Sequence, residues 1–144
     1  MNPHALHVFT DGASNYDSVQ TGGIGFSIVF PDHLELEPIE GSINVNGQGI
    51  HKLELQGIIY AMDMVLDWSK QNPEPCRKIT GGVIFHTDRH SIIDTELTGA
   101  YRIDGWRKNG WKTNDGTPIK HVDLLDQIDK KRRKISNTFS GKVE

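Results

Sequence analysis

Three acidic residues, Asp11, Glu54 and Asp88, stand where the sequence pattern predicts that a strand ends or a helix begins. Carboxylates that a fold gathers in one place raise one another's pKa unless a cation lies between them. Mg²⁺ takes hard oxygen ligands, keeps several waters and completes its shell with substrate phosphate. The three residues therefore indicate a metal-dependent nuclease, in which bound ions activate a water and stabilise the leaving 3′ oxygen of a phosphodiester.

Each of these residues has an ordinary structural explanation when it is taken alone. An Asp-Gly pair after a strand is a common turn, and a glutamate near a helix start is favoured by the helix dipole by about 0.3–1 kcal/mol. Glu54 changes this balance, because it lies one turn before Ile58 and near the face of Ala61 and Val65. An unpaired carboxylate that faces a sheet is unfavourable to bury, so a shared cation is the better explanation.

The elements that must position these residues alternate between strand and helix patterns. Alternating or short apolar runs predict a meander of three antiparallel strands, at 5–11, 22–30 and near 39–46. Apolar residues at 3.6-residue spacing predict a helix at 53–68. A glycine-led apolar run at 81–88 predicts a buried strand parallel to the first.

A strand, a crossover helix and a parallel strand form a right-handed unit, and ligands of such sheets gather at the carboxyl ends of the strands. Asp11 and Asp88 both hold that position in the pattern. After them we expect helical or turn-rich segments at 90–97 and 101–109.

One more helix and one more strand are expected near the end of the chain. The helix is predicted at 122–134 with Val122, Leu125 and Ile128 facing inward, and a terminal strand is predicted near 135–139. The predicted fold class is α/β, with a mixed five-stranded sheet whose first three strands are antiparallel and which is flanked by helices.

Length and composition fit one domain over residues 1–144. A domain of that size buries about 68–70% of the surface of its unfolded chain, which is enough for a single core. The one cysteine, Cys76, follows a Pro-rich stretch at 73–75 that reads as a loop, and it allows no internal disulfide. No charged-then-apolar leader or long apolar span is visible. We therefore expect a cytoplasmic protein with no membrane partner.

Charge is distributed unevenly along the chain, whose formal net charge is −3. Residues 100–144 hold 11 Lys and Arg against 6 Asp and Glu, a net +5, and residues 1–99 hold 5 against 13, a net −8. An acidic half that can collect cations is thus joined to a basic half that can collect phosphates. The run from Lys130 to Lys134 is, by itself, interpreted as a solvated charged helix.

Five strings in this chain resemble type 1 ribonuclease H, in order and at the expected spacing, and the last is the most specific. They are FTDGAS at 9–14, GGIGF at 22–26, LELQGIIYAM at 53–62, HTDRHSII at 86–93 and WRKNGWKTNDGTPIKHVDLLDQID at 106–129. The resemblance implies a ribonuclease H-like fold and cleavage of the RNA strand of an RNA/DNA hybrid, leaving 5′-phosphate and 3′-hydroxyl ends. It also implies Mg²⁺ as the cofactor, with Mn²⁺ as a substitute, and we expect a monomer.

The resemblance carries roles over to individual residues. Asp11, Glu54 and Asp88 fall on three of the four family carboxylates and are expected to be both catalytic residues and metal ligands. The Trp-rich basic stretch matches the family's protrusion that grips the DNA strand. Its tryptophans are expected both to contact nucleic acid and to pack as a platform that keeps the protrusion folded, and its lysines are expected to contact phosphate. The expected nucleic-acid-binding residues are Ser14, Asn15, His51, His90, Trp106, Arg107, Lys108, Trp111, Lys112, Lys120 and His121.

The sequence departs from the family in three places. His51 stands where family members carry an Asn, and Arg89 and His90 stand where they carry Ser-Gln. Lys142 replaces a mobile His, and the family's final helix with its fourth Asp is missing, so we expect a C-terminally truncated domain. A degraded gene, a lineage that tolerates the loss, and substitution by Glu144 stay open as alternatives.

Two functions from different classes remain. The first is a hybrid-specific ribonuclease whose activity is lowered by the missing carboxylate. The second is a catalytically impaired domain that binds hybrid or duplex nucleic acid without cutting it. Another nuclease or an integrase of the wider superfamily is disfavoured by the Trp-rich protrusion at 106–112.

Overall fold

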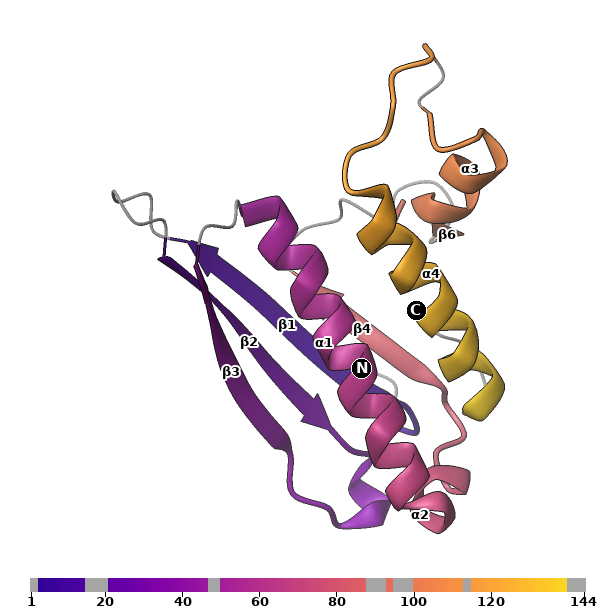
Figure 1. Cartoon of the computed structure of the whole chain (residues 1–144). Helices are drawn as coiled ribbons and strands as arrows, with labels where there is room; N and C mark the ends of the chain where they lie inside the picture. The colour runs from indigo at the N-terminus through magenta and orange to yellow at the C-terminus, as the bar shows by residue number, and fades with distance from the viewer. Residues whose placement is uncertain are drawn as a thin grey trace.

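A four-stranded mixed sheet is the centre of the described structure. This computed structural model describes residues 3–14, 21–46, 50–87, 93–94, 100–112 and 115–139. In that part of the chain the main sheet has the strand order β3-β2-β1-β4 (Figure 1). Its strands are β1 (Leu6–Ser14), β2 (Thr21–Val29), β3 (Ile39–Asn46) and β4 (Val83–Thr87). β1 pairs antiparallel with β2 and β2 antiparallel with β3, whereas β4 pairs parallel with β1. These directions agree with the sequence prediction.

Helix α1 (Ile50–Gln71) connects β3 to β4 and packs across β1 and β2 (Figure 1). Its predicted apolar stripe faces the sheet: Leu55, Ile58, Met62 and Val65 are all buried. The opposing strand residues include Leu6 and Val8, which have no exposed surface. The 3.6-residue period of the sequence therefore identified the helix and its buried face correctly.

The second helix of the core is α4 (Val122–Thr138), which lies beside α1 (Figure 1). Leu125 and Ile128 are buried as predicted, and Val122 is half-buried. The smaller elements are η1 (Asp32–Leu34), α2 (Pro73–Arg77), β5 (Ile93–Asp94), β6 (Ala100–Tyr101) and α3 (Arg102–Lys108). Among the helices of the described part, none is long and apolar enough to cross a membrane.

The predicted terminal strand at 135–139 is wrong. α4 continues through it to Thr138, because Ile135 and Phe139 extend the buried side of the helix that Ile128 begins. The seven-residue step from Ile128 to Ile135 is two helical turns and outweighs the local alternation. The main sheet consequently has four strands, not five, among the residues that the structure describes.

Two shorter predictions also fail. The predicted loop at 73–75 begins a one-turn helix, α2, in which Pro73 occupies the first turn, where its missing N–H is tolerated. The helical or turn-rich segment predicted at 90–97 contains β5, which pairs antiparallel with β6. Cys76 lies buried in α2 and is free.

Candidate functional site

The carboxyl ends of the two parallel strands lie at the same edge of the sheet. In the register of β1 with β4, Thr10 stands opposite Thr87, the last residue of β4. Asp11 follows Thr10 on β1, where its backbone pairs with Gly25 of β2. Asp88 follows Thr87 in the sequence and lies outside the described residues. Among the described residues, the parallel pairing of β1 with β4 therefore stops just before Asp11, whereas β1 itself continues past its predicted end at residue 11 to Ser14, paired with β2.

Glu54 lies in the second turn of α1, the helix that packs over β1 and β2. Its backbone is described and its side chain is not. Hard carboxylate oxygens are the donor set that Mg²⁺ or Mn²⁺ prefers, so the residue types fit such an ion. In the described residues, which leave out the side chains of these three acids, there is no group of three or more His, Cys, Asp or Glu placed to hold a metal.

Several of the predicted site residues cannot be placed further. Asp88, Asn15 and His90 lie wholly outside the described residues. For four others the structure gives the backbone alone, which belongs to β1 or to the first turns of α1: Asp11, Ser14, His51 and Glu54.

A pair of histidines lies on β1 and β4 below this edge. Nδ1 of His7 and Nε2 of His86 are 2.9 Å apart, and the ring of His86 stacks on that of Phe9 at a centroid distance of 4.5 Å. Burial lowers the pKa of His86, and the neighbouring His7 lowers it further. The rings of His7, Phe9 and His86 thus lie together on the face of the sheet away from Leu6 and Val8.

The predicted tryptophans lie on the two sides of a tight turn, Trp106 in the last turn of α3 and Trp111 just after that helix. Trp106 and Trp111 are half-buried and pack against the hydrophobic core. The N–H of Trp111 donates to the carbonyl of Trp106 at 2.7 Å, and the N–H of Ile119 donates to the carbonyl of Trp111 at 3.0 Å. Trp111 has a φ of 61°, so the turn carries backbone strain at that residue. This geometry supports the packing role for both tryptophans.

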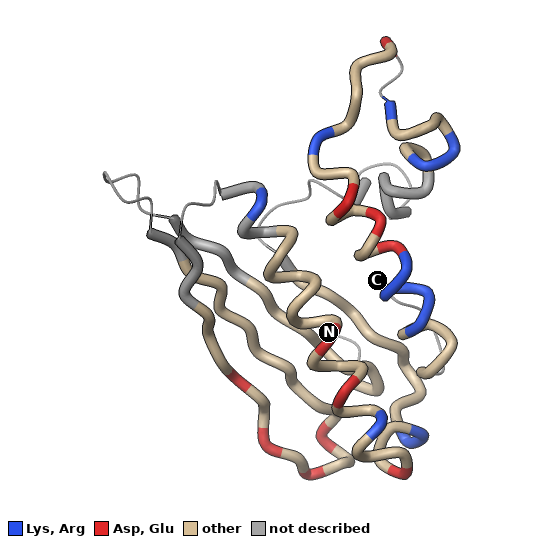
Figure 2. The backbone as a smooth tube through the Cα atoms, viewed as in Figure 1, with Lys and Arg blue, Asp and Glu red and all other residues tan. Residues whose placement is uncertain are grey.

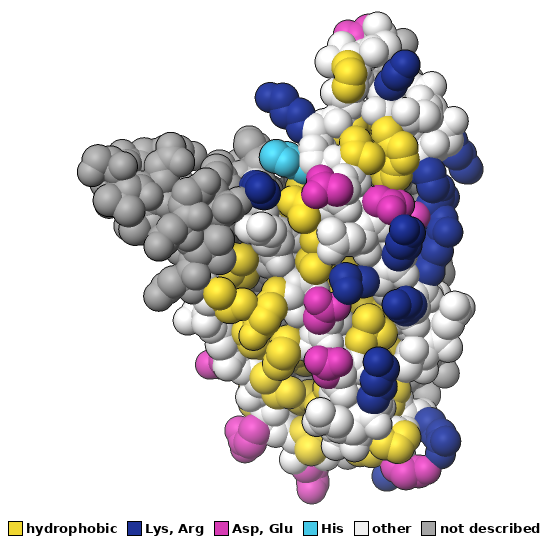
Figure 3. Space-filling model, in the orientation of Figure 1, with side chains coloured by type: hydrophobic (Ala, Val, Ile, Leu, Met, Phe, Trp, Pro, Cys, Tyr) yellow, Lys and Arg dark blue, Asp and Glu magenta, His cyan; other side chains and the backbone are white. Residues whose placement is uncertain are grey.

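The predicted lysines of this region are exposed. Lys108 ends α3, Lys112 follows the turn and forms an isolated bridge with Pro118, and Lys120 precedes α4. His121 is half-buried at the N-cap of α4 with a φ of 59°. Figure 3 shows Lys and Arg side chains in a row along the α3 and α4 side of the molecule. Ammonium groups that face water in this way are available to phosphate oxygens.

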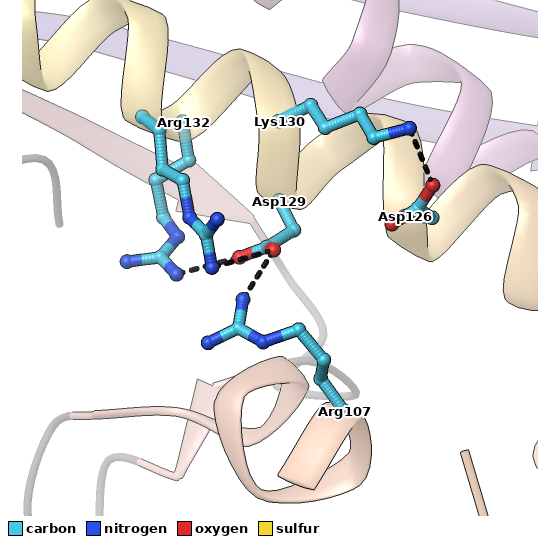
Figure 4. Close-up of polar contacts among 6 residues, drawn as sticks. Arg107, Asp126, Asp129, Lys130 and Arg132 are labelled. Atoms are coloured by element: carbon cyan, nitrogen blue, oxygen red, sulfur yellow. Dashed lines mark hydrogen bonds and ion pairs between the residues drawn. The ribbon is translucent and has the colours of Figure 1, made fainter. Parts of the chain in front are cut away.

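Arg107 differs from the lysines, because it is paired within the protein. It reaches from α3 to the carboxylate of Asp129 on α4, where it donates to Oδ2 (Figure 4). Asp129 is only 2% exposed and also accepts from Nη2 of Arg132 at 2.7 Å and pairs with Arg133 at 3.2 Å. We name these four residues the Asp129 cluster. Arg107 therefore fixes α3 on α4, and contact with nucleic acid stays a prediction for it.

The pKa of Asp129 reflects this environment. Burial acts to raise it, but the hydrogen bonds from Arg132 and Arg107 and the nearby positive charges outweigh burial and lower the pKa. Sequence reasoning missed Asp129. The available signal was its position one residue after Ile128, on the inward side of the helix and directly before the basic run.

Residues of the basic run on α4 form ion pairs with neighbouring carboxylates. Lys130 pairs with Asp126 at 3.0 Å along the helix, and Lys131 pairs with Asp63 of α1 at 2.6 Å. Figure 2 shows the acidic residues in the first half of α4 and the basic ones in the second half. The run is therefore a charged helix segment as predicted, but it is not solvated throughout, because the side chains of Lys131 and Arg132 are only 23% and 18% exposed in their ion pairs.

Comparison with known proteins gives a consistent result. Residues 3–140 match the family model described as RNase H. Ribonuclease H of Shewanella sp. (strain W3-18-1) is 30% identical over 125 residues, which cover 87% of this chain and 67% of that protein.

Solved structures of the same fold were also found. A foamy viral protease-reverse transcriptase in complex with RNA/DNA hybrid aligns with a TM-score of 0.68 at 17% identity, over 100% of this chain and 18% of that one. The solution structure of the PFV RNase H domain aligns with a TM-score of 0.64 at 18% identity, over 96% of this chain and 78% of that one. At such identities the likeness shows the fold, which is ribonuclease H-like.

Proposed function

This chain belongs to the ribonuclease H family, and we propose that it hydrolyses the RNA strand of RNA/DNA hybrids with the help of a divalent metal ion. The observation that carries the proposal is the parallel register of Thr10 with Thr87. This register places Thr10 of β1 beside Thr87 of β4, and these two residues directly precede Asp11 and Asp88 in the sequence. Helix α1, which contains Glu54, packs over the same strands.

We assign Asp11, Glu54 and Asp88 as the residues that hold Mg²⁺, with Mn²⁺ as a substitute. A bound ion would supply an activated water and stabilise the charge on the leaving 3′ oxygen, which gives 5′-phosphate and 3′-hydroxyl products. Mn²⁺ is expected to support the reaction better than Mg²⁺, because Mg²⁺ demands a nearly ideal octahedral site.

The described lysines are proposed to hold the substrate. Lys108, Lys112 and Lys120 are exposed and lie around the turn that follows α3 and before α4. The tryptophans of this turn keep it folded, so that the lysines project from a fixed base. The remaining predicted contacts, at Ser14, Asn15, His51, His90, Arg107 and His121, are proposed on the family resemblance.

Three further properties of the protein stay predictions. A single domain and a monomeric state rest on the length of the chain and on its family. A cytoplasmic setting rests on the single cysteine, which is buried in the described structure.

A cleavage assay tests the function. Purified protein is incubated with a hybrid labelled in its RNA strand, with Mg²⁺ or with Mn²⁺, beside duplex DNA as a substrate control. We expect metal-dependent cuts in the RNA strand alone, and their loss in Asp11→Asn. Asp67→Asn is the matched control, because Asp67 is an exposed aspartate near the other end of α1.

The assay also decides between the two classes of function. Tight hybrid binding with no turnover, even in Mn²⁺, would replace the enzyme by the binding domain. No binding and no cleavage would refute both assignments.

A further inference from the structure

At Gly57, helix α1 lies against strand β2 more closely than a side chain allows. A Cβ atom built on Gly57 would be 2.8 Å from Cγ2 of Ile24, and 3.8 and 3.9 Å from two further atoms of that side chain. Real Cβ atoms essentially never approach a heavy atom within 3.0 Å. Gly57 is buried and Ile24 is 3% exposed. Any side chain at residue 57 must therefore displace the isoleucine or the helix.

This contact lies next to the proposed carboxylate site on both elements. On the sheet, Ile24 stands opposite Gly12, and the next pair in the register is Gly25 with Asp11. On the helix, Gly57 comes three residues after Glu54, and one helical turn takes 3.6 residues, so the two residues lie within one turn of each other. Positions three apart in a helix lie on the same face. The contact therefore defines how far the Glu54 turn stands from the strand that carries Asp11.

Neither β2 nor the later part of α1 can move easily to make room for a side chain at residue 57. Ile24 pairs with Gly12 on one side and with Ile43 on the other, because β2 is an inner strand. Its branched side chain is stiff about χ1. On the helix, Ile58 and Ala61 are 3% and 0% exposed. Added bulk at residue 57 would therefore be relieved by lifting the first turns of α1, which include Glu54.

Helix propensity alone disfavours a glycine at position 57. Glycine inside a helix is less favourable than alanine by about 0.5–1 kcal/mol. Gly57 lies in the interior of a 22-residue helix, and its lack of a side chain allows the helix to approach the sheet closely. Local structure thus favours alanine at this position, and packing at the site favours glycine.

We propose that Gly57 is a positioning residue for the metal site: it sets the height of the Glu54 turn above β1 and β2 and thereby the affinity for the divalent ion. This inference rests on the proposed function, because it takes Asp11 and Glu54 as ligands of one site. Gly57 itself contacts neither metal nor substrate.

The first test measures Mn²⁺ binding by titration calorimetry, with no nucleic acid present. Gly57→Ala is expected to weaken binding about 10-fold or more, the size seen when groups that orient metal ligands are changed. Gly57→Val, which is bulkier, should weaken it further. Gly105→Ala is the matched control, because a Cβ on this exposed α3 glycine would meet nothing within 4 Å, and its Mn²⁺ affinity should equal that of the wild type.

A rescue experiment separates positioning from a general loss of structure. Ile24→Ala removes the Cγ2 atom that a Cβ at residue 57 would strike. In Gly57→Ala/Ile24→Ala, Mn²⁺ affinity should return toward the wild-type value even though the unfolding midpoint stays low, since Ile24 is a buried side chain. A merely structural role predicts that the double variant binds Mn²⁺ more weakly than either single variant.

The outcomes distinguish this inference from the proposed function. Wild-type protein that binds no Mn²⁺ would overturn both. Wild-type binding that Asp11→Asn abolishes, together with unchanged binding in Gly57→Ala and Gly57→Val, would overturn the role of Gly57 alone. The graded loss from Ala to Val decides the matter if Ile24→Ala does not fold.

Discussion

Helix α1 and helix α3 are held in place by different forces. α1 rests on the sheet through buried apolar side chains such as Ile58, Met62 and Val65. α3 is joined to α4 by the Asp129 cluster, in which one buried carboxylate pairs with three arginines. Among the side chains that the structure describes, the contact between α1 and the sheet thus involves buried apolar side chains and no charge. In the basic half, the carboxylate lets several arginines stand close together, because it offsets their mutual repulsion.

Removing Asp129 is expected to have the largest effect on stability. Asp129→Ala leaves Arg107, Arg132 and Arg133 facing one another without their counter-charge. Breaking a buried ion pair by removing one partner typically reduces the free energy of unfolding by about 3–5 kcal/mol. Arg133 is half-exposed and can turn to water, so the lower end of that range is expected. Urea unfolding followed by circular dichroism measures the change.

Asp126→Ala is the control for this variant, since Asp126 is 40% exposed and pairs with Lys130 on the helix surface. Its loss should stay below about 1 kcal/mol, as for other exposed pairs. Equal losses in the two variants would show that burial of Asp129 does not matter.

Met62→Ala tests the apolar side of the comparison. Met62 is 1% exposed between α1 and the sheet. Truncating a buried methionine costs about 2–5 kcal/mol, because apolar contacts are lost and a cavity remains. Met64→Ala, two residues along the same helix and only half-buried, should cost clearly less. The same urea experiment measures both, and the difference should not change with salt, since no charge is involved.

Acid should weaken the ionic contact and leave the apolar one unchanged. The pKa of Asp129 is lowered in the folded protein, so its contribution is fully present above the ordinary aspartate value of about 3.9 and is lost as pH falls through the folded pKa. The gap in unfolding free energy between wild type and Asp129→Asn should therefore narrow below about pH 4. The gap between wild type and Met62→Ala should stay constant over the same range. A gap for Asp129→Asn that is independent of pH would mean that its carboxylate is not ionised in the fold.

The sequence predicted the apolar packing of α1 on the sheet far better than the ionic contact between α3 and α4. Apolar spacing is local, so the buried face of α1 and the meander that it covers could be read directly from the chain. The Asp129 cluster joins residues 22 positions apart, and nothing local selects Asp129 rather than a phosphate as the partner of Arg107.

The candidate site was predictable only as far as strand direction allowed. The rule that ligands gather at carboxyl ends of parallel strands selected Asp11 from its place on β1. The role of Gly57 could not be predicted, because a close approach between α1 and β2 depends on the packing of Ile24 against the helix. A glycine inside a helical pattern indicates only that packing or function has overruled propensity.

The exposed lysines provide a smaller effect, on binding rather than on folding. Lys108→Ala and Lys112→Ala should each flatten the log-log dependence of hybrid affinity on salt, by about 0.9 for each phosphate contact on duplex nucleic acid. Lys70→Ala is the control, because Lys70 is exposed in the last turn of α1. Fluorescence anisotropy at several salt concentrations gives the slopes. Unchanged slopes in both variants would place the phosphate contacts elsewhere on the protein.

The smallest effect is expected for the ion pair that joins α1 to α4. Nζ of Lys131 on α4 lies 2.6 Å from Oδ1 of Asp63 on α1, and the two side chains are 23% and 48% exposed. Solvent screens such a pair, so Lys131→Ala should reduce the free energy of unfolding by about 0.2–1 kcal/mol. A double-mutant cycle with Asp63→Ala isolates the pair, and its coupling should shrink further in 1 M salt, where the Debye length is about 3 Å. A coupling above that of Asp129 with Arg107 would reverse the comparison, because the contact between α1 and α4 would then depend on charge more than the contact between α3 and α4 does.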